Sequence, residues 1–243
     1  MTKHSKDWYT SWFDTPFYHI LYKDRDEKEA QSFMENLTSY LNIDEKGNIL
    51  DLACGKGRHA VYLNSIGYNV TGIDLSQKSI DFAKNFENIN LKFDVHDMRK
   101  PYHNKFNAVF NLFTSFGFFE DDLDDLNTIR AIKANLKENG IGVIDFMNTD
   151  FVIDNLVADN SKVVEDITFN LKRYVSDNFV IKDIEFEYDG EQYSFQEKVK
   201  ALRLTDFQDM FDQTGVQLLD VFGDYKLHKF DHKTSERLIM IFM

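Results

Sequence analysis

One short segment holds the residues whose types and spacing could do chemistry, Ile49-Leu-Asp-Leu-Ala-Cys-Gly-Lys-Gly-Arg-His-Ala. It joins an apolar run, which is typical of a buried strand, to a helical stretch. Gly55 and Gly57 let the backbone turn sharply and bring a ligand close, because no Cβ stands in the way. The N–H groups and the dipole of the following helix favour a negatively charged ligand group. The segment therefore predicts a small-ligand site at the end of a strand.

A nearby acidic position indicates that the ligand contains adenosine. Asp74 ends the next apolar run and follows Gly57 by 17 residues. An acid that grips ribose hydroxyls is expected at about this place. The two oxygens of a carboxylate match two vicinal hydroxyls, so the pairing suits any adenosine cofactor.

Two such cofactors compete for the site. Gly55, Gly57 and Ala60 have the spacing of the dinucleotide fingerprint, whose third position accepts alanine. However, Asp51 at the end of the first strand would repel a pyrophosphate, whereas it could hold the cationic methionine end of S-adenosylmethionine. About 45 residues also precede this strand, while a dinucleotide unit often opens its domain. These features favour S-adenosylmethionine over NAD(P).

Asp97 supports the same choice. It follows the third strand, in Asp94-Val-His-Asp97-Met98. An acid there can accept a hydrogen bond from the exocyclic amine of adenine while the methionine packs against the ring. Any one of these residues could be a turn or a cap, but their joint occurrence at strand ends is hard to explain in that way.

Together these residues resemble the class I S-adenosylmethionine-dependent methyltransferases of the small-molecule type. The family's acid-x-Gly-x-Gly-x-Gly signature appears as Asp51-Leu-Ala53-Cys-Gly55-Lys-Gly57, with Ala53 at the first glycine position. The resemblance extends from about Asn48 to Met147 and implies methyl transfer that leaves S-adenosylhomocysteine. It also implies these cofactor-binding residues: Asp51, Ala53, Gly55 and Gly57 around the methionine moiety, Asp74 at the ribose, Leu75, Asp97 and Met98 at the adenine, and Asn111.

No residue is identified as catalytic, for a chemical reason. Methyl transfer from a sulfonium is an in-line displacement, so the protein must mainly align the reactants and exclude water. A general base is needed only if the nucleophile must lose a proton. His59, His96 and His103 are candidates, although a lone histidine is more often a surface or packing residue. His228 and His232 have the spacing of a metal pair but no obvious third ligand, so no metal site is predicted.

Aromatic residues are the candidates for substrate contact. The segment Asn111-Leu-Phe-Thr-Ser-Phe-Gly-Phe-Phe lacks the Asn/Asp-Pro-Pro-Tyr sequence of amino-methylating enzymes that act on nucleobases or glutamine. It indicates instead a small-molecule pocket wall with Phe116 in it, and core packing is an equal alternative. Trp12, Tyr18 and Tyr22 could form a lid over the sulfonium or the substrate, because aromatic faces attract cations. Equally, these rings could cover the sheet or a dimer contact, which leaves a homodimer open.

Strands and helices alternate along residues 27–147. We expect strands at 48–52, 68–73, 91–95, 106–113 and 141–147, and helices at 27–41, 57–66, 76–86 and 121–136. This order is typical of a doubly wound, Rossmann-like α/β fold with a mostly parallel sheet. A helix at 206–213 and strands at 216–222 and 237–242 follow. By resemblance, these last strands complete a seven-stranded sheet as a C-terminal antiparallel hairpin.

Residues 160–202 differ, because they alternate and contain an Asp189-Gly190 pair, which predicts an antiparallel β insertion. We expect a single domain with four parts: an aromatic and helical lid region at 1–45, a cofactor-binding core at 46–158, the insertion at 160–202, and the final helix and strands at 203–243. The insertion is expected to roof the pocket or to form an oligomer interface.

Composition limits the setting and the partners. The net charge of −13 disfavours a nucleic-acid substrate, although solubility alone would also explain it. Cys54 is the single cysteine, which excludes an internal disulfide. The polar start from Met1 to Lys6 does not resemble a signal peptide, and no apolar run approaches the length of a membrane span. We therefore expect a cytoplasmic enzyme with a small-molecule substrate; an NAD(P)-dependent oxidoreductase and a non-catalytic partner subunit are the alternatives.

Overall fold

The computed structural model describes residues 8–23 and 27–243 of the chain. The polar start from Met1 to Lys6 lies outside the described residues. Within the described part, no helix combines the length and the apolar character that crossing a membrane requires.

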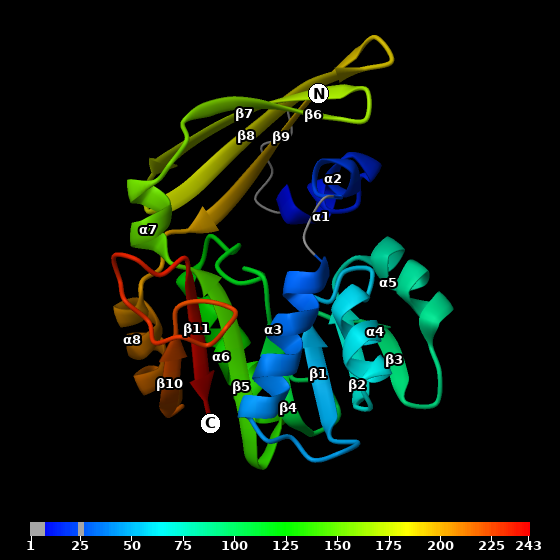
Figure 1. Ribbon diagram of the computed structural model, residues 1–243, viewed down its shortest axis with the longest axis vertical. Coiled ribbons are helices and arrows are strands. Elements are labelled where there is room, and N and C mark those ends of the chain that lie inside the picture. The colour runs from blue at the N-terminus through cyan, green and yellow to red at the C-terminus, as the bar shows by residue number, and fades with distance from the viewer. Residues whose placement is uncertain (1–7, 24–26) are drawn as a thin grey trace.

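A seven-stranded sheet forms the centre of the lower body in Figure 1. Its strands run in the spatial order β10-β11-β5-β4-β1-β2-β3. They are β1 (Asn48–Leu52), β2 (Asn69–Asp74), β3 (Leu91–Val95), β4 (Phe106–Asn111), β5 (Leu136–Met147), β10 (Leu218–Phe222) and β11 (Arg237–Phe242). Strands β1 to β5 pair in parallel, whereas β11 pairs antiparallel with both β5 and β10. The predicted fold class, with its C-terminal antiparallel hairpin, is confirmed.

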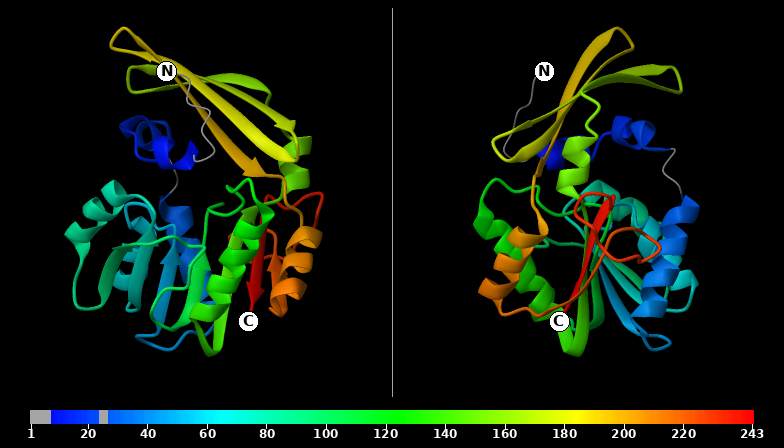
Figure 2. Two further views of the ribbon diagram at one scale, coloured as in Figure 1. Left: turned by 180° about the vertical axis from the view of Figure 1, so that it is seen from behind. Right: turned by 60° about the vertical axis from the view of Figure 1, so that its left-hand side comes forward.

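Helices cover both faces of this sheet (Figures 1 and 2). They are α3 (Glu27–Tyr40), α4 (Arg58–Ser65), α5 (Gln77–Ala83) with the short 3₁₀ helix η1 (Lys84–Phe86) after it, α6 (Asp122–Asn135) and α8 (Leu204–Thr214). Ile49 and its neighbours on one face pack against α3, α4 and α5. Leu50 points to the other face, where α6 and α8 supply the partners. Successive residues of a buried strand thus serve two cores, because side chains alternate across a sheet.

A second sheet stands above the carboxyl ends of the parallel strands (Figure 1). It follows α7 (Thr149–Asp154) and contains, in spatial order, β6 (Asp159–Val164), β7 (Ile167–Ser176), β8 (Phe179–Tyr188) and β9 (Glu191–Lys200). All its pairs are antiparallel, which confirms the predicted β insertion. The helices α1 (Trp8–Trp12) and α2 (Pro16–Leu21) pack on one face of this sheet, in an apolar cluster that includes Phe169 and Phe186.

Some predicted boundaries are wrong for local reasons. The helix expected to run to 136 ends at Asn135, and β5 begins at once. Phe106 pairs with Leu136 while Ala108 pairs with Ile141, so the Asn139-Gly140 turn signal lies in an irregularity inside the strand. The strand expected at 106–113 stops at Asn111, because Phe113 takes a left-handed backbone conformation, with φ of 57°.

Candidate functional site

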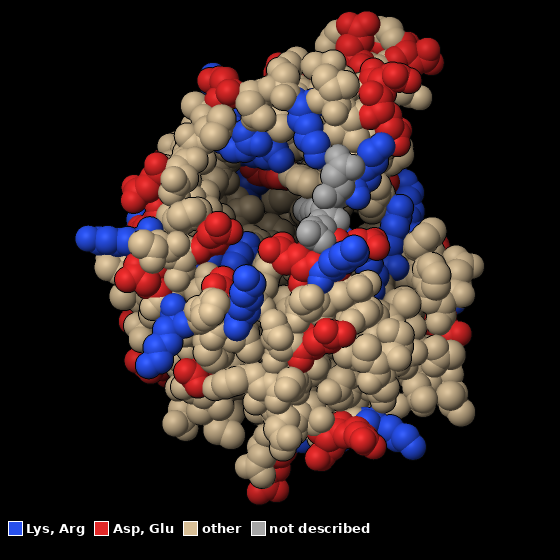
Figure 3. Space-filling model, viewed as in Figure 1, with Lys and Arg blue, Asp and Glu red and all other residues tan. Residues whose placement is uncertain are grey.

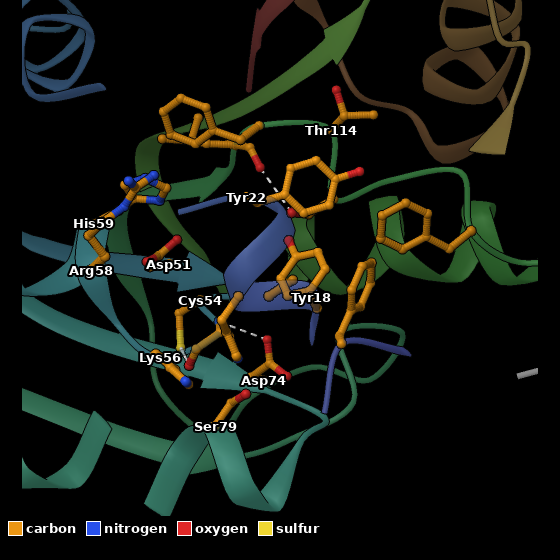
Figure 4. Close-up of a pocket in the computed structure, with 18 of the residues that line it drawn as sticks. Tyr18, Tyr22, Asp51, Cys54, Lys56, Arg58, His59, Asp74, Ser79 and Thr114 are labelled. Atoms are coloured by element: carbon orange, nitrogen blue, oxygen red, sulfur yellow. Dashed lines mark hydrogen bonds between the residues drawn. The ribbon is translucent and has the colours of Figure 1, made fainter. Parts of the chain in front are cut away.

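A cavity of about 480 Å³ lies between the lower body and the second sheet. Its floor is formed by the loop after β1, the end of β2 and the turn after β4, and its roof by α2 and β9. Figure 3 shows this hollow, and Figure 4 shows side chains that line it. The volume falls within the range of small-ligand sites, about 300–1,000 Å³. The position also fits, because ligands of open α/β sheets bind at the carboxyl ends of the strands.

The loop after β1 has a left-handed backbone at three positions, with φ of 59° at Ala53, 54° at Gly55 and 81° at Gly57. The two glycines serve different purposes. A Cβ added to Gly57 would stand 2.6 Å from the Phe93 ring, so the fold itself requires glycine there. A Cβ added to Gly55 would meet no atom within 4 Å. Because Gly55 lines the cavity, this open space is room in which a ligand can approach the backbone.

Asp51 carries a buried oxygen that lacks a partner. The residue lies one position before the end of β1 and is only 3% exposed, and its Oδ2 accepts no hydrogen bond from any described residue. Burial, and then the charge of Asp74, raise the pKa of Asp51 to about 7, although the N–H of Ala60 partly opposes this. An unpaired buried carboxylate oxygen is costly, and a cationic ligand group would satisfy it. This environment fits an ammonium group.

Asp74 connects the end of β2 to the loop after β1. Its Oδ2 accepts the Gly55 N–H and its Oδ1 accepts the Ser76 N–H, both at 2.8 Å. Burial raises the pKa of this carboxyl, and the backbone donors oppose the rise. Each oxygen keeps a second lone pair, so the carboxylate can also accept hydrogen bonds from two vicinal hydroxyls. The side chain thus both shapes the loop and suits a ribose.

The residues expected at the adenine lie off the cavity wall. Leu75 is 45% exposed. Asp97 is held by Arg99, whose Nε lies 2.9 Å from Oδ1 and whose Nη2 lies 2.7 Å from Oδ2. Burial would raise the pKa of Asp97, but hydrogen bonds and charge from Arg99 outweigh it and leave the pKa lowered. Of the nine predicted cofactor residues, four line the cavity (Asp51, Ala53, Gly55 and Asp74) and five do not (Gly57, Leu75, Asp97, Met98 and Asn111).

Of the four predicted substrate residues, two line the cavity and two do not. Tyr18 and Tyr22 line the cavity, and Figure 4 shows both rings among the lining side chains. Trp12 is buried behind this wall, where its ring lies 4.6 Å from that of Phe195. Phe116 is fully buried in the core that includes α6 and α8, which is the core-packing alternative considered above.

Glu197 is a cavity residue that no sequence pattern indicates. It lies on β9, and its Oε1 accepts hydrogen bonds from Trp12 Nε1 at 2.8 Å and from Tyr22 Oη at 2.7 Å. Lys182 Nζ lies 3.6 Å from Oε2. The carboxylate thereby joins the N-terminal helices to the second sheet. Trp12 and Tyr22 are 185 and 175 residues away from Glu197 in sequence, so local sequence patterns cannot indicate the cluster.

A strained turn after β4 forms another part of the wall. Phe113 and Thr114 have φ of 57° and 60°, a backbone conformation that is costly for residues other than glycine. Asp145 holds the turn: its Oδ2 accepts the Phe113 N–H at 2.7 Å and its backbone oxygen accepts the Thr114 N–H at 3.0 Å. Arg237 Nη2 donates to Thr114 Oγ1 at 3.0 Å. Such strain persists where the surroundings enforce it, which is common at functional sites.

Only one of the three candidate histidines lines the cavity, His59. Its ring stacks on Phe113 at 4.3 Å, and its Nε2 lies 2.9 Å from Arg58 Nη2. His228 is bonded to Asp224 on the surface. Within residues 8–23 and 27–243, no three acidic, histidine or cysteine side chains are grouped so as to hold a metal ion.

Comparisons with known proteins point to one class of enzyme. Residues 49–140 match a family model described as "Methyltransferase domain". The chain is 31% identical over 198 residues to a Bacillus subtilis protein named "Putative methyltransferase YqeM", and the match covers 76% of this chain and 79% of that one. A glycine/sarcosine N-methyltransferase of Halorhodospira halochloris is 25% identical over 189 residues, which cover 73% of this chain and 68% of the relative.

Among solved structures, the fold is similar to that of an S-adenosylmethionine-dependent methyltransferase from Clostridium acetobutylicum, with a TM-score of 0.79 and 20% identity. This match covers 93% of this chain and 95% of that one. An amino pentose methyltransferase from Micromonospora echinaspora, in a structure with bound cofactor, has a TM-score of 0.73 and 15% identity, and the match covers 94% and 96% of the two chains.

Proposed function

Because this chain belongs to the class I S-adenosylmethionine-dependent methyltransferases, we propose that it methylates a small molecule held in the cavity beneath the second sheet. When bound, the cofactor supplies a sulfonium methyl group with a good leaving group. The role of the protein is then to hold both reactants in line and to exclude water. This role does not require a general base, and none has been identified in the site.

The observation that carries the proposal is the unpaired Oδ2 of Asp51 beside the open space at Gly55. A buried anion at the end of β1 suits the ammonium of a methionine moiety. It would oppose a pyrophosphate, which also counts against the NAD(P)-dependent alternative. Asp74, whose Oδ2 accepts the Gly55 N–H at 2.8 Å, would bind the ribose hydroxyls of the cofactor.

The roof supports a small acceptor. Tyr18 and Tyr22 line the cavity, and Glu197 connects Tyr22, at the end of α2, to β9. Aromatic rings close to a sulfonium would stabilise its charge and keep water away. Several relatives are named for small acceptors, glycine and an amino pentose among them. The net charge of −13 disfavours a nucleic-acid acceptor. We also propose that the enzyme acts in the cytoplasm.

Thermal unfolding with S-adenosylmethionine, S-adenosylhomocysteine and NAD tests the cofactor. At a hundredfold the dissociation constant, a ligand adds about 2.7 kcal/mol, which should raise the midpoint by about 5–10 °C. We expect this shift with both sulfur ligands and not with NAD. Asp74→Ala should abolish it, while Asp81→Ala, at an exposed position of α5, should keep it. A shift with NAD alone would contradict the proposal.

Transfer of a labelled methyl group then tests the acceptor class. Amino acids, amino sugars, a tRNA mixture and a denatured protein would be incubated with the enzyme and labelled cofactor. We expect label in small molecules. Label confined to the RNA or to the protein would contradict the small-molecule proposal while leaving the methyltransferase family intact.

A further inference from the structure

Trp8 carries a buried hydrogen-bond donor that lacks a partner. The residue lines the cavity and is only 6% exposed, and its indole Nε1 donates no hydrogen bond to any described residue. The other tryptophan of α1 differs, because Trp12 Nε1 donates to Glu197 Oε1 at 2.8 Å. An unpaired buried donor is costly, and each one in a folded protein needs an explanation. Because Trp8 lines the cavity, a ligand held there can supply the missing acceptor.

The surroundings of Trp8 are aromatic. Its ring meets those of Phe13 and Phe118 edge to face, with centroids 5.3 and 5.4 Å apart, and both of these residues also line the cavity. Phe13 in turn meets Tyr18, another lining residue, with centroids 4.8 Å apart. We call Trp8, Phe13, Tyr18 and Phe118 the aromatic wall. A flat apolar ring packs well against such a wall, because the edges and faces of aromatic rings attract each other.

The aromatic wall also limits the group that can pair with the indole. An indole N–H only donates, so a protonated amine cannot serve as its partner. A charged oxygen without a counter-ion would be strongly destabilised among aromatic rings. A carbonyl, ether or hydroxyl oxygen can accept the N–H without that cost. The missing partner of Trp8 is therefore best supplied by a neutral oxygen.

The aromatic wall adjoins the proposed cofactor site. Ser76 Oγ donates to Asp14 Oδ1, so the connection between α1 and α2 is held beside the end of β2, where Asp74 lies. In the view of Figure 4, Tyr18 lies between Tyr22 and Asp74. A ring that packs on the wall is thus on the side of the cavity at which Asp74 is expected to hold the cofactor.

We propose that the methyl acceptor is a molecule with a flat apolar ring and a neutral oxygen, and that Trp8 selects it by donating the indole N–H to this oxygen. The inference rests on the proposed function, because it takes the molecule beside the aromatic wall to be the methyl acceptor. It assigns to Trp8 a role in specificity and none in the transfer itself. Compounds without the oxygen should gain nothing from the indole N–H.

The indole N–H signals test the proposal in the intact protein. Trp8 and Trp12 are the only tryptophans of the chain, so labelling tryptophan with a nitrogen isotope gives two NMR signals, and Trp8→Phe assigns them. With S-adenosylhomocysteine present, the protein would be titrated with acetophenone, anisole and phenol, which carry an oxygen on a ring, and with ethylbenzene, which carries none. We expect at least one oxygen compound to move the Trp8 proton downfield, as a new hydrogen bond does, and ethylbenzene not to do so.

Trp8→Phe tests the same contact through affinity. The variant keeps a ring but removes the N–H, so it should weaken the oxygen compounds that move the signal by about 5- to 10-fold and change the affinity for ethylbenzene by less than about twofold. Trp12→Phe is the matched control, because it makes the same change in the same helix at an N–H that already has a partner. It should cost more stability than Trp8→Phe and preserve the preference for the oxygen.

Two results would overturn the proposal. A Trp8 signal that none of the oxygen compounds moves would show that the indole N–H is satisfied within the protein, by the face of a neighbouring ring. Equal weakening of ethylbenzene and of the oxygen compounds by Trp8→Phe would show a role in packing alone. Failure of S-adenosylhomocysteine to bind, with the Trp8 response intact, would instead overturn the proposed function, and with it the identity of the bound ring as a methyl acceptor.

Discussion

The buried Asp145 and the partly buried Arg237 form an ion pair that joins two neighbouring strands to the wall of the cavity. Arg237 Nε and Nη2 lie 2.8 and 2.7 Å from Asp145 Oδ1, across the β5–β11 pairing. The same two side chains contact the strained turn, Asp145 through Phe113 N–H and Arg237 through Thr114 Oγ1. The C-terminal hairpin therefore does more than close the sheet, since it also holds a part of the site.

Loss of this arginine should destabilise the protein strongly. Asp145 is fully buried, so Arg237→Gln would leave a buried carboxylate uncompensated. We expect a loss of about 3–5 kcal/mol in the free energy of unfolding, measured by urea denaturation. Arg203→Gln, which breaks a surface pair with Asp150, should cost less than about 1 kcal/mol. Equal costs for the two variants would contradict a supporting role of the pair of Asp145 and Arg237.

Cofactor affinity should depend on pH through Asp51. Its pKa is raised by burial to about 7, above the ordinary value of 3.8, so the ligand-free protein loses stability as pH rises from about 4 to 7. The ammonium of the cofactor needs the charged carboxylate and itself remains protonated in this range. The dissociation constant of S-adenosylhomocysteine should therefore rise up to about tenfold per unit as pH falls from 7 to 5. Asp51→Asn should bind weakly with no such slope, and an unchanged slope would point to another group.

Alanine at the two loop glycines should have separable effects. Gly55→Ala adds a methyl group with no protein atom within 4 Å, at a position that lines the cavity. It should cost about 1–2 kcal/mol of stability from its backbone conformation while lowering cofactor affinity more than tenfold. Gly57→Ala, whose Cβ would collide with Phe93, should cost more stability than Gly55→Ala. Denaturation and calorimetry on both variants check this, and the reverse order of stabilities would refute it.

The link between Glu197 and the N-terminal helices can be followed by fluorescence. The only two tryptophans of the chain, Trp8 and Trp12, lie in α1, and both are buried. Glu197→Ala removes the acceptor of Trp12 Nε1 and should cost about 1–3 kcal/mol. We expect emission to shift to longer wavelength and acrylamide to quench it more strongly. Glu191→Ala at the exposed start of β9 is the control, and equal quenching in both variants would argue against the link.

The parts of the site with local signatures could be predicted from sequence. Strands β3 and β11 have the expected bounds, since short apolar runs end there at clear breaks. Asp51 and Asp74 could be expected near each other because parallel strands bring their carboxyl ends to one edge of a sheet. The open space at Gly55 and the unpaired oxygen of Asp51 give these expectations a physical basis.

What could not be predicted depends on distant partners. Glu197 belongs to an alternating strand, and nothing in that alternation shows which polar side chain faces the cavity. The start of β5 at Leu136 could not be predicted, because the pairing of Phe106 with Leu136 overrides the turn preference of Asn139-Gly140. Asp97 has the residue type expected at an adenine, yet its pairing with Arg99 could not be inferred from spacing.

The contact between Trp12 and Glu197 also sets an order of events during synthesis. Helix α1 leaves the ribosome before its partner on β9, which is made 185 residues later. At about 5–20 residues per second this is an interval of about 10–40 s. Until β6 to β9 have been made, the aromatic cluster of α1 and α2 lacks the complete sheet that will bury it, and is therefore a natural place for a chaperone to bind. The part of the cavity wall that α2 and β9 form therefore cannot be completed before β9 has been made.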